Sequence, residues 1–258
     1  MLNPSNILIT GASNGIGKAL AIKYSRPGIK LFLTGRDQAR LDHVAQLCQQ
    51  KGAEISSFSC DVRDNQTLLN WIYKCDDKAP VDLVIANAGI SAGTGGGDEK
   101  IEQVTNIFST NINGVLNTIY PAIERMKQRQ SGQIAIISSL AGYRGLPSSP
   151  AYSASKAAVK ILGEGLRGHL AKYNIEVTVV TPGYIKTDMT AMNNFYMPFL
   201  MNVEKAAEII VNKLQKNPAR IAFPWPLYFI VWLITLLPPF ITDPILNLLP
   251  GKAAQDKN

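Results

Sequence analysis

Short apolar runs alternate with longer amphipathic stretches along most of the chain, and this alternation limits the possible folds more than any other feature. Runs of about four to eight residues predict strands, and the stretches of about ten or more between them predict helices. Strands joined through helices pair in parallel, with crossovers that are nearly always right-handed. We therefore expect an α/β fold with a single-domain, Rossmann-type, doubly wound parallel sheet and helices on both faces.

The predicted strands cover residues 6–10, 30–34, 54–58, 81–86, 133–138 and 176–181, and the predicted helices cover residues 15–24, 37–50, 65–73, 101–128 and 152–172. Residues 220–224 are a candidate for one more strand, at the edge of the sheet.

The composition excludes several classes of protein. Hydrophobic residues make up 46% of the 258 residues, which is enough for one large buried core. Cys48, Cys60 and Cys75 have no CxxC spacing and no nearby histidine pair, so we expect neither a disulfide framework nor a metal site. The net charge of +7 is spread among acids without a basic arm, so we expect no nucleic-acid partner. The sequence opens without a signal-peptide pattern, which predicts a cytoplasmic protein.

The turn between the first predicted strand and the first predicted helix is rich in glycine, with the sequence TGASNGIG at 10–17. Glycine lets the backbone turn tightly and approach a pyrophosphate, and the helix N-terminus adds free N–H groups and the positive end of its dipole. Such glycines often mark only a tight turn, but their place in the first βα turn favours cofactor binding. The cofactor residues predicted here are Gly11, Ser13, Asn14, Gly15, Ile16 and Gly17.

The TGxxxGxG spacing resembles that of the short-chain dehydrogenase/reductase family, and the further motifs of that family follow in order over residues 5–190. Tyr152 and Lys156 form a YxxxK motif, thirteen residues after Ser139. The resemblance implies an oxidoreductase with Asn111, Ser139, Tyr152 and Lys156 as catalytic residues. It also implies cofactor contacts by Asp61, Val62, Asn87, Ala88, Gly89, Tyr152, Lys156, Pro182, Gly183, Ile185 and Thr187.

The residues themselves indicate an acid–base pair. Tyr152 and Lys156 lie four apart on one predicted helix and so share a face. A free tyrosine has a pKa of about 10, and a nearby ammonium group should lower it. We therefore expect Tyr152 to be the general acid for carbonyl reduction, with Ser139 as a hydrogen-bond donor to the substrate oxygen. The resemblance implies that Lys156 also holds the nicotinamide ribose and that Asn111 holds a water that relays protons to Lys156.

Some of these assignments have competitors nearby. Ser138 adjoins Ser139 and is a less favoured candidate, because the spacing to Tyr152 fits Ser139. Asn106 and Asn113 flank Asn111, which is alternatively a buried structural amide.

The end of the second predicted strand indicates the cofactor. An acidic residue at this point would bind the ribose 2′-hydroxyl of NAD. Here Gly35 takes that position and Arg36 follows it. Glycine leaves room for a 2′-phosphate, and a guanidinium group can bind a phosphate with two hydrogen bonds. We therefore expect a preference for NADP(H), while Asp37, one residue later, leaves NAD(H) open.

The C-terminal segment has a different composition, so we divide the chain into a catalytic domain over 1–223 and an apolar extension over 224–258. No charged residue occurs from 221 to 242, and six prolines fall between 224 and 250. The eleven residues between Pro226 and Pro238 make about 16 Å of helix, too short for about 30 Å of hydrocarbon. We expect one or two short helices over Trp225–Pro250 that do not span a bilayer.

Three roles remain open for this extension. It is a peripheral anchor on the inner face of a membrane through 224–250, a wall of an apolar substrate pocket, or an interface of a homodimer or homotetramer.

The primary interpretation of the whole chain is an NADP(H)-dependent oxidoreductase that interconverts a carbonyl and a secondary alcohol on an apolar small-molecule substrate. The alternatives are a catalytically idle NADP-binding sensor or scaffold, and a peripheral membrane protein with secondary dehydrogenase activity. Specificity is expected from residues 89–98, 143–150 and 189–202.

Overall fold

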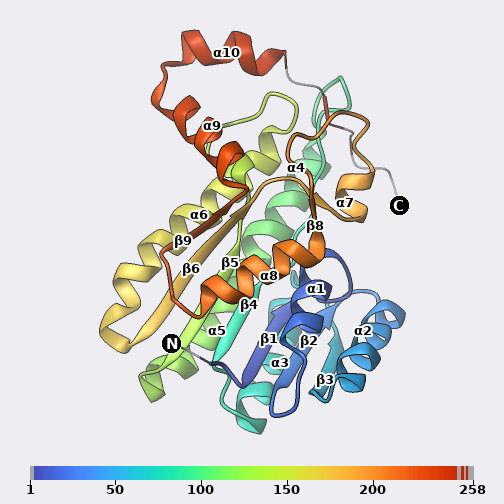
Figure 1. Cartoon of the computed structure of the whole chain (residues 1–258), viewed down its shortest axis with the longest axis vertical. Coiled ribbons are helices and arrows are strands. Elements are labelled where there is room, and N and C mark those ends of the chain that lie inside the picture. Colours follow the sequence, from blue (N-terminus) through green and yellow to red (C-terminus); the bar gives the residue numbers. More distant parts are fainter. Residues whose placement is uncertain (1–2, 249–250, 253, 255–258) are drawn as a thin grey trace.

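A seven-stranded parallel sheet forms the centre of the molecule, in a computed structural model that describes residues 3–248, 251, 252 and 254 (Figure 1). The strand order is β3-β2-β1-β4-β5-β6-β9, so the chain winds outward in both directions from β1 and β4. The predicted doubly wound sheet is therefore confirmed, with 220–223 as the edge strand. The strands are β1 (Asn6–Thr10), β2 (Lys30–Gly35), β3 (Glu54–Ser59), β4 (Leu83–Ala86), β5 (Gly132–Ile137), β6 (Ile175–Pro182) and β9 (Arg220–Phe223).

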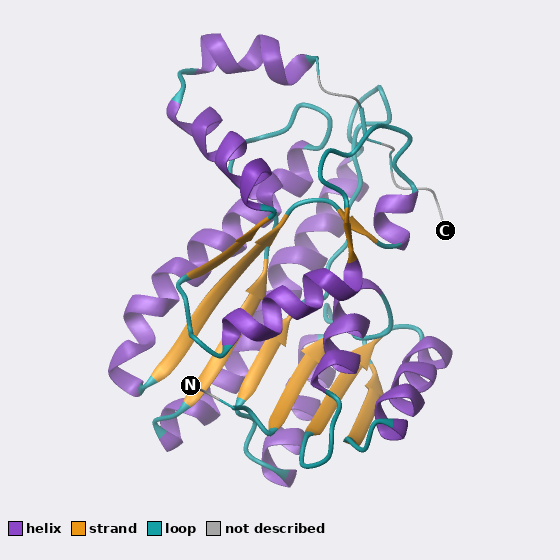
Figure 2. Ribbon diagram, in the orientation of Figure 1, coloured by secondary structure: helices purple, strands orange, loops and turns teal. Residues whose placement is uncertain are grey.

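Helices cover both faces of the sheet (Figure 2). One apolar core lies between the sheet and helices α1 (Gly15–Tyr24), α2 (Gln38–Gln50) and α8 (Val203–Leu214). The other lies between the sheet and helices α3 (Asn65–Lys78), α5 (Gly114–Arg129) and α6 (Pro150–Leu170). The inner strands β1, β2, β4, β5 and β6 are buried along nearly their whole length because helices cover both of their faces, whereas the edge strand β3 is partly exposed.

The single helix predicted over 101–128 is interrupted. Helix α4 (Ile101–Phe108) and helix α5 are joined by a π-helical turn over Ser109–Asn113. The apolar pattern runs through this turn, so periodicity alone gave no sign of it. π-helical turns occur mostly as short insertions within α-helices, frequently at functional sites. This one contains the fully buried Asn111.

Some short elements had not been predicted from the sequence. Strands β7 (Ile185–Lys186) and β8 (Met201–Asn202) form a separate parallel pair, and helix α7 (Asp188–Ala191) lies between them along the chain. Single 3-10 turns occur at Leu140–Gly142 and Ala171–Tyr173. The longer helix α8 had not been predicted either, and it contributes Ile210 to the first core.

The C-terminal extension forms two helices, α9 (Trp225–Leu236) and α10 (Pro239–Asn247), at one end of the molecule (Figure 1). Pro226 and Pro239 stand in their first turns, where proline suits a helix. The predicted short, proline-bounded helices are therefore confirmed up to Leu248, while Leu249 and Pro250 lie outside the described residues. Within the described part of the chain, no helix combines the length and the apolar character needed to cross a membrane.

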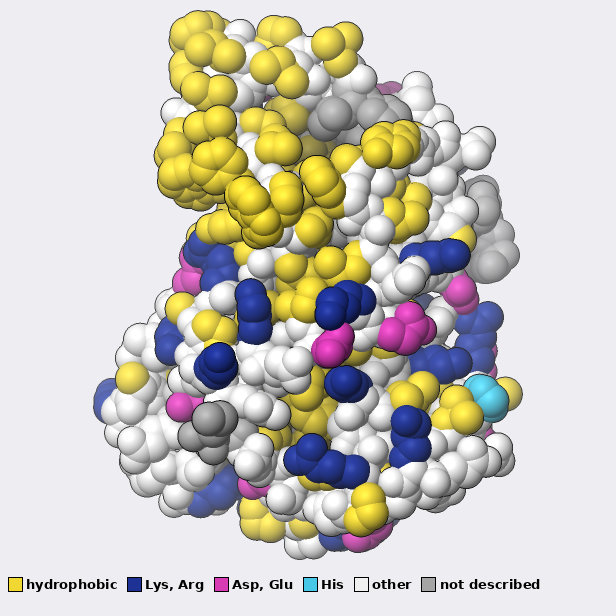
Figure 3. Space-filling model, viewed as in Figure 1, with side chains coloured by type: hydrophobic (Ala, Val, Ile, Leu, Met, Phe, Trp, Pro, Cys, Tyr) yellow, Lys and Arg dark blue, Asp and Glu magenta, His cyan; other side chains and the backbone are white. Residues whose placement is uncertain are grey.

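Apolar side chains cover the outer surface of this extension (Figure 3). Helix α9 contains no fully buried residue. Among the most exposed side chains are Trp225 at 72%, Phe240 at 77% and Leu248 at 85%. Because soluble monomers rarely expose large continuous apolar patches, this surface is a candidate for contact with another apolar body.

Candidate active site

A cavity of about 1030 Å³ lies beyond the carboxyl ends of the central strands. It extends from the turns after β2 and β3 to the extension, and its lining comes from segments far apart in the sequence. The predicted site residues that line it are Gly11, Ser13, Asn14, Gly15, Ile16, Gly35, Arg36, Asp61, Val62, Asn87, Ala88, Gly89, Ser139, Tyr152, Lys156, Pro182, Gly183, Ile185 and Thr187. Gly17 and Asn111 are not among its lining residues.

The glycine-rich turn after β1 requires its glycines for backbone reasons. Gly11 and Gly15 have φ values of +65° and +54°, which L side chains rarely adopt. A Cβ on Gly17 would lie 2.2 Å from the carbonyl oxygen of Gly11, so Gly17 permits helix α1 to pack against the turn. Asn14 caps the helix, because its Oδ1 accepts a hydrogen bond from the Gly15 N–H at 2.7 Å.

Asn87 holds the ends of β1 and β4 together. Its Nδ2 donates hydrogen bonds to the carbonyl oxygens of Thr10, at 3.0 Å, and Gly11, at 3.1 Å. Its backbone N–H donates to Thr10 Oγ1 at 3.1 Å. The side chain of Asn87 therefore fixes the shape of the glycine-rich turn.

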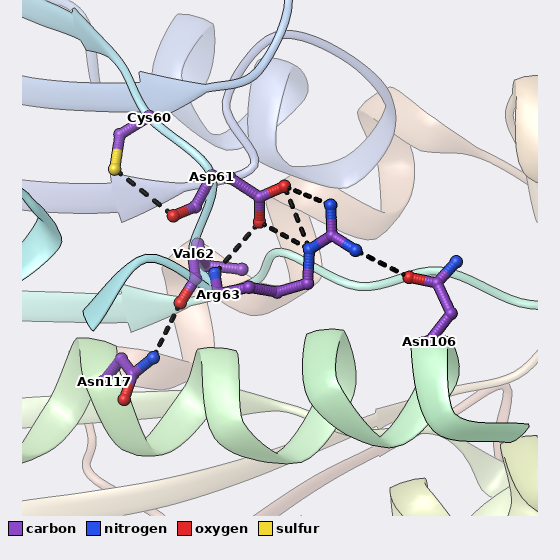
Figure 4. Close-up of polar contacts among 6 residues, drawn as sticks. All are labelled: Cys60, Asp61, Val62, Arg63, Asn106 and Asn117. Carbon is purple, nitrogen blue, oxygen red and sulfur yellow. Dashed lines mark hydrogen bonds and ion pairs between the residues drawn. The ribbon is translucent and has the colours of Figure 1, made fainter. Parts of the chain in front are cut away.

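Asp61 lies after β3 and is paired with Arg63 (Figure 4). Arg63 Nη2 lies 2.6 Å from Asp61 Oδ2, and Arg63 Nη1 donates to Asn106 Oδ1 at 2.9 Å. The hydrogen bond from the Arg63 guanidinium keeps the pKa of the Asp61 carboxyl below its usual value. The carbonyl oxygen of Val62 accepts a hydrogen bond from Asn117 Nδ2 at 2.9 Å. This end of the cavity is thus held by α4 and α5.

The turn after β2 presents positive charge to the cavity. Arg36 is exposed and lines it, and a Cβ on Gly35 would lie 2.9 Å from Ser13 Oγ. Asp37 caps helix α2, since its Oδ1 accepts from the Arg40 N–H at 2.9 Å, and its Oδ2 lies 3.3 Å from Arg40 Nε. The carboxylate of Asp37 is therefore engaged by its own helix. Arg40 also lines the cavity and had not been predicted.

The two neighbouring serines after β5 lie in different environments. Ser138 is buried, and its Oγ donates to the carbonyl oxygen of Lys156 at 2.7 Å, which anchors helix α6 to the sheet. Ser139 lines the cavity and hydrogen-bonds Tyr152. The Ser139 Oγ also accepts from the Ala141 N–H at 3.1 Å.

Tyr152 and Lys156 project from helix α6 into the same end of the cavity. Burial raises the pKa of the Tyr152 hydroxyl above its usual value, while its hydrogen bonds with Ser139 and Ser91 oppose this shift. The predicted lowering of this pKa is therefore wrong for the protein alone, because desolvation outweighs the favourable neighbours. Lys156 Nζ lies 5.9 Å from the centroid of the Tyr152 ring. Burial, reinforced by the charge of Lys252, lowers the pKa of Lys156 to about 8.

Asn111 is held by the segment after β4. Its Nδ2 donates to the carbonyl oxygen of Ile90 at 2.9 Å and to Ser155 Oγ at 3.0 Å, and its Oδ1 accepts from the Ile90 N–H at 2.8 Å. A Cβ on Gly89 would lie 3.1 Å from Asn111 Oδ1 and 3.3 Å from Lys156 Nζ. The Asn111 amide and the Lys156 ammonium therefore both lie close to Gly89. These hydrogen bonds are consistent with the alternative that Asn111 is a buried structural amide.

The segment after β6 closes the cavity from another side. Gly183 donates its N–H to the carbonyl oxygen of Phe223 at 2.8 Å, which joins this segment to the edge strand. Thr187 caps helix α7, and Asp188 Oδ2 accepts from Asn14 Nδ2 at 2.6 Å. Thr187 lies beside the glycine-rich turn, since a Cβ on Gly15 would lie 3.3 Å from Thr187 Cγ2, and Ile185 lines the cavity.

Three residues near Tyr152 were missed by the sequence reasoning. Ser91 hydrogen-bonds Tyr152, and Tyr184 lies near enough to raise its pKa. Lys252 comes from the C-terminal end of the chain and also lines the cavity. Tyr184 could have been suspected from its place beside the PG motif, whereas Ser91 and Lys252 carry no motif.

This fold and site define a nucleotide-binding oxidoreductase of the Rossmann type. The family model described as short chain dehydrogenase matches residues 5–195, and the chain belongs to this family. It is 36% identical over 237 residues to an uncharacterized oxidoreductase of Myxococcus xanthus, covering 92% of this chain and 94% of that protein.

Solved structures of other proteins agree with this family assignment. A short-chain type dehydrogenase/reductase from Mycobacterium marinum has a TM-score of 0.77 and 26% identity, covering 85% of this chain and 93% of that one. The structure titled ElxO with NADP bound has a TM-score of 0.75 and 25% identity, covering 85% of this chain and 97% of that one.

Proposed function

We propose that this oxidoreductase uses NADP(H) to interconvert a carbonyl and a secondary alcohol on an apolar substrate. One observation carries the proposal: Ser139, Tyr152 and Lys156 meet at one end of a cavity whose other end holds a glycine-rich turn and Arg36. The first end has the groups for proton transfer, and the second has the groups for a nucleotide phosphate.

The residues present fit a nicotinamide dinucleotide. Gly11 and Gly15 form a backbone cradle that side chains would strain, at the N-terminus of α1, where anions are stabilised. Arg36 stands exposed beside the small Gly35, a combination that suits a 2′-phosphate. Asp37 supports the preference, because a carboxylate engaged by Arg40 is poorly placed to bind a ribose 2′-hydroxyl. The neighbouring structure with NADP bound is consistent with this choice.

The bound nicotinamide would supply the hydride for reduction. Tyr152 then gives its proton to the carbonyl oxygen as that oxygen gains the electrons of the C=O bond, and the product is an alcohol. The raised pKa of Tyr152 keeps its hydroxyl protonated and able to donate. Ser139 donates a hydrogen bond to the same oxygen and stabilises its growing negative charge. The ammonium of Lys156 stabilises the phenolate left behind.

Apolar side chains from the extension support an apolar substrate. The cavity lining includes Leu227, Ile230, Val231 and Ile234 from α9, and Leu246 from α10. The lining also includes Phe195, Tyr196 and Phe199 of the segment before β8. Burying hydrocarbon here is worth about 0.8 kcal/mol for each methylene group. A purely idle NADP sensor would need neither this wall nor the arrangement around Tyr152.

The outer face of α9 and α10 supports a second proposal, that this surface rests on a lipid bilayer as a peripheral contact. Trp225, Trp232 and Phe240 are exposed on it, and aromatic side chains of this kind favour the headgroup region. An apolar substrate would then pass between the bilayer and the cavity along the same helices.

NADPH absorbance with paired ketones tests the first proposal. We expect 2-octanone to be reduced with a kcat/KM at least tenfold above that of acetone, because its longer chain contacts the apolar wall. NADPH should support faster turnover than NADH. Equal values for the two ketones would contradict the apolar site, and absence of any turnover over a broad ketone and alcohol panel would favour the sensor.

A further inference from the structure

The chain after α10 returns to the cavity and places Lys252 beside Tyr152. Lys252 Nζ lies 4.6 Å from the centroid of the Tyr152 ring and donates a hydrogen bond to Ser91 Oγ. These contacts join the C-terminal end of the chain to the loop after β4 and to helix α6. The site therefore holds a second lysine besides Lys156.

The glycine-rich loop after β4 receives this segment. The Gly95 N–H donates to the carbonyl oxygen of Lys252 at 2.8 Å. A Cβ on Gly93 would lie 2.5 Å from Lys252 Cβ, so a larger residue at this position would displace the segment. Gly93 thus permits the close approach of Lys252 to this loop.

The extension is also fastened at its second helix. Arg144, from the loop after β5, donates from Nη2 to Thr242 Oγ1 at 3.0 Å and to Asp243 Oδ1 at 2.7 Å. Thr242 is fully buried, and Leu246 lines the cavity. The path that brings Lys252 to Tyr152 is therefore fixed at several points.

The charge of Lys252 has no acidic partner in the described cavity lining. Asp37 and Asp61 are the carboxylates found there, and they follow β2 and β3. These strands lie at least three positions from β5 in the sheet, roughly 14 Å at the usual strand spacing. Burial lowers the pKa of Lys252 to about 8, so the ammonium form still predominates at pH 7.

An ammonium group has three N–H donors, and Ser91 accepts one of them. A half-buried cation is costly unless an anion or several acceptors satisfy it. A carboxylate in the cavity would do so, and it would stand next to the hydroxyl that the proposed reaction uses. The apolar wall from α9 would hold the hydrocarbon part of the same molecule.

We propose that Lys252 is a specificity-determining residue, whose ammonium binds a substrate carboxylate close to the carbonyl that is reduced. The substrate class is an oxo acid with an apolar chain. This inference rests on the proposed function for the identity of the reacting group, but the carboxylate site itself does not depend on turnover.

Calorimetric binding of two unreactive probes, octanoate and octanamide, tests the site on the full-length protein at pH 7. The probes share length and shape and differ in charge. We expect the unmodified protein to bind octanoate at least tenfold more tightly. Lys252→Met, which keeps the apolar stem, should remove this difference, and Lys252→Arg should retain part of it. Lys216→Met changes an exposed lysine after α8 and serves as the matched control, with the preference unchanged.

Equal affinities for the two probes, no measurable octanoate binding, or a preference that survives in Lys252→Met would each overturn the inference. The proposed function fails separately. If octanoate binds through Lys252 but no oxo acid is reduced, the carboxylate site stands and the reaction is wrong. If neutral ketones are reduced while octanoate and octanamide bind equally, the reaction stands and the inference falls.

Discussion

Lys156 Nζ donates a hydrogen bond of 3.0 Å to the carbonyl oxygen of Ile137, the last residue of β5. Ser138, the next residue, donates back to the carbonyl oxygen of Lys156. Helix α6 is therefore fixed to the end of the sheet by both the side chain and the backbone of one lysine. This reciprocal contact sets where Tyr152, one turn earlier, meets the cavity.

The first prediction concerns pH. Because burial and Lys252 lower the pKa of Lys156 to about 8, its ammonium form is present below pH 8 and is lost above it. The kcat/KM for NADPH-dependent reduction, which reports the free enzyme, should fall as the pH rises through about 8. In Lys252→Met the break should move to higher pH, because the repelling charge is gone. A pH profile from 6 to 10 with an uncharged ketone measures both, and an unshifted break in the variant would contradict the coupling.

The second prediction concerns the proton donor. Tyr152→Phe removes the hydroxyl and keeps the ring, so NADPH affinity should change by less than about threefold. Turnover should drop by about 10²–10⁴, the usual worth of general acid catalysis. Stopped-flow reduction and NADPH fluorescence titration measure the two effects. Retention of more than about a tenth of the turnover would show that another group supplies the proton.

The third prediction concerns the cofactor. Arg36→Ala should weaken NADPH binding by about 1.5–3 kcal/mol, the worth of a hydrogen bond to a charged group, and leave NADH nearly unchanged. Arg26→Ala, at another exposed position, is the matched control and should change neither. Titration of both cofactors decides the matter. Equal losses for NADPH and NADH in Arg36→Ala would show that Arg36 contacts a part that both share.

Much of the fold could be predicted because its signals are local. Each central strand is a short apolar run, and the pair Tyr152 and Lys156 is fixed by one helical turn. The π-helical turn at Ser109–Asn113 was missed because the hydrophobic pattern does not change there. Arg40 was missed because its contact with the cavity depends on how α2 begins.

The position of Lys252 in the site could not be predicted from local sequence patterns. Its hydrogen-bond partner Ser91 is 161 residues away in the sequence, and the contact depends on the path of α9 and α10. The composition of the extension indicated apolar contacts, but it did not say where the chain goes after them. That path is set by tertiary contacts such as those of Arg144 with Thr242 and Asp243, and of Gly95 with Lys252.

The last prediction concerns the outer surface of the extension. Leu236 and Phe240 are exposed and do not line the cavity, so their substitution should spare the chemistry. Burying one large apolar side chain is worth about 1.5–3 kcal/mol, so Leu236→Asp with Phe240→Asp should lower vesicle affinity by about a hundredfold or more. Tyr120→Asp, exposed on α5, is the control and should bind as before. Cosedimentation with phosphatidylglycerol and phosphatidylethanolamine vesicles measures this, with ketone turnover in parallel. If the unmodified protein stays in the supernatant and the double variant instead falls from dimer to monomer in light scattering, the surface joins two copies of the chain and the lipid proposal is wrong.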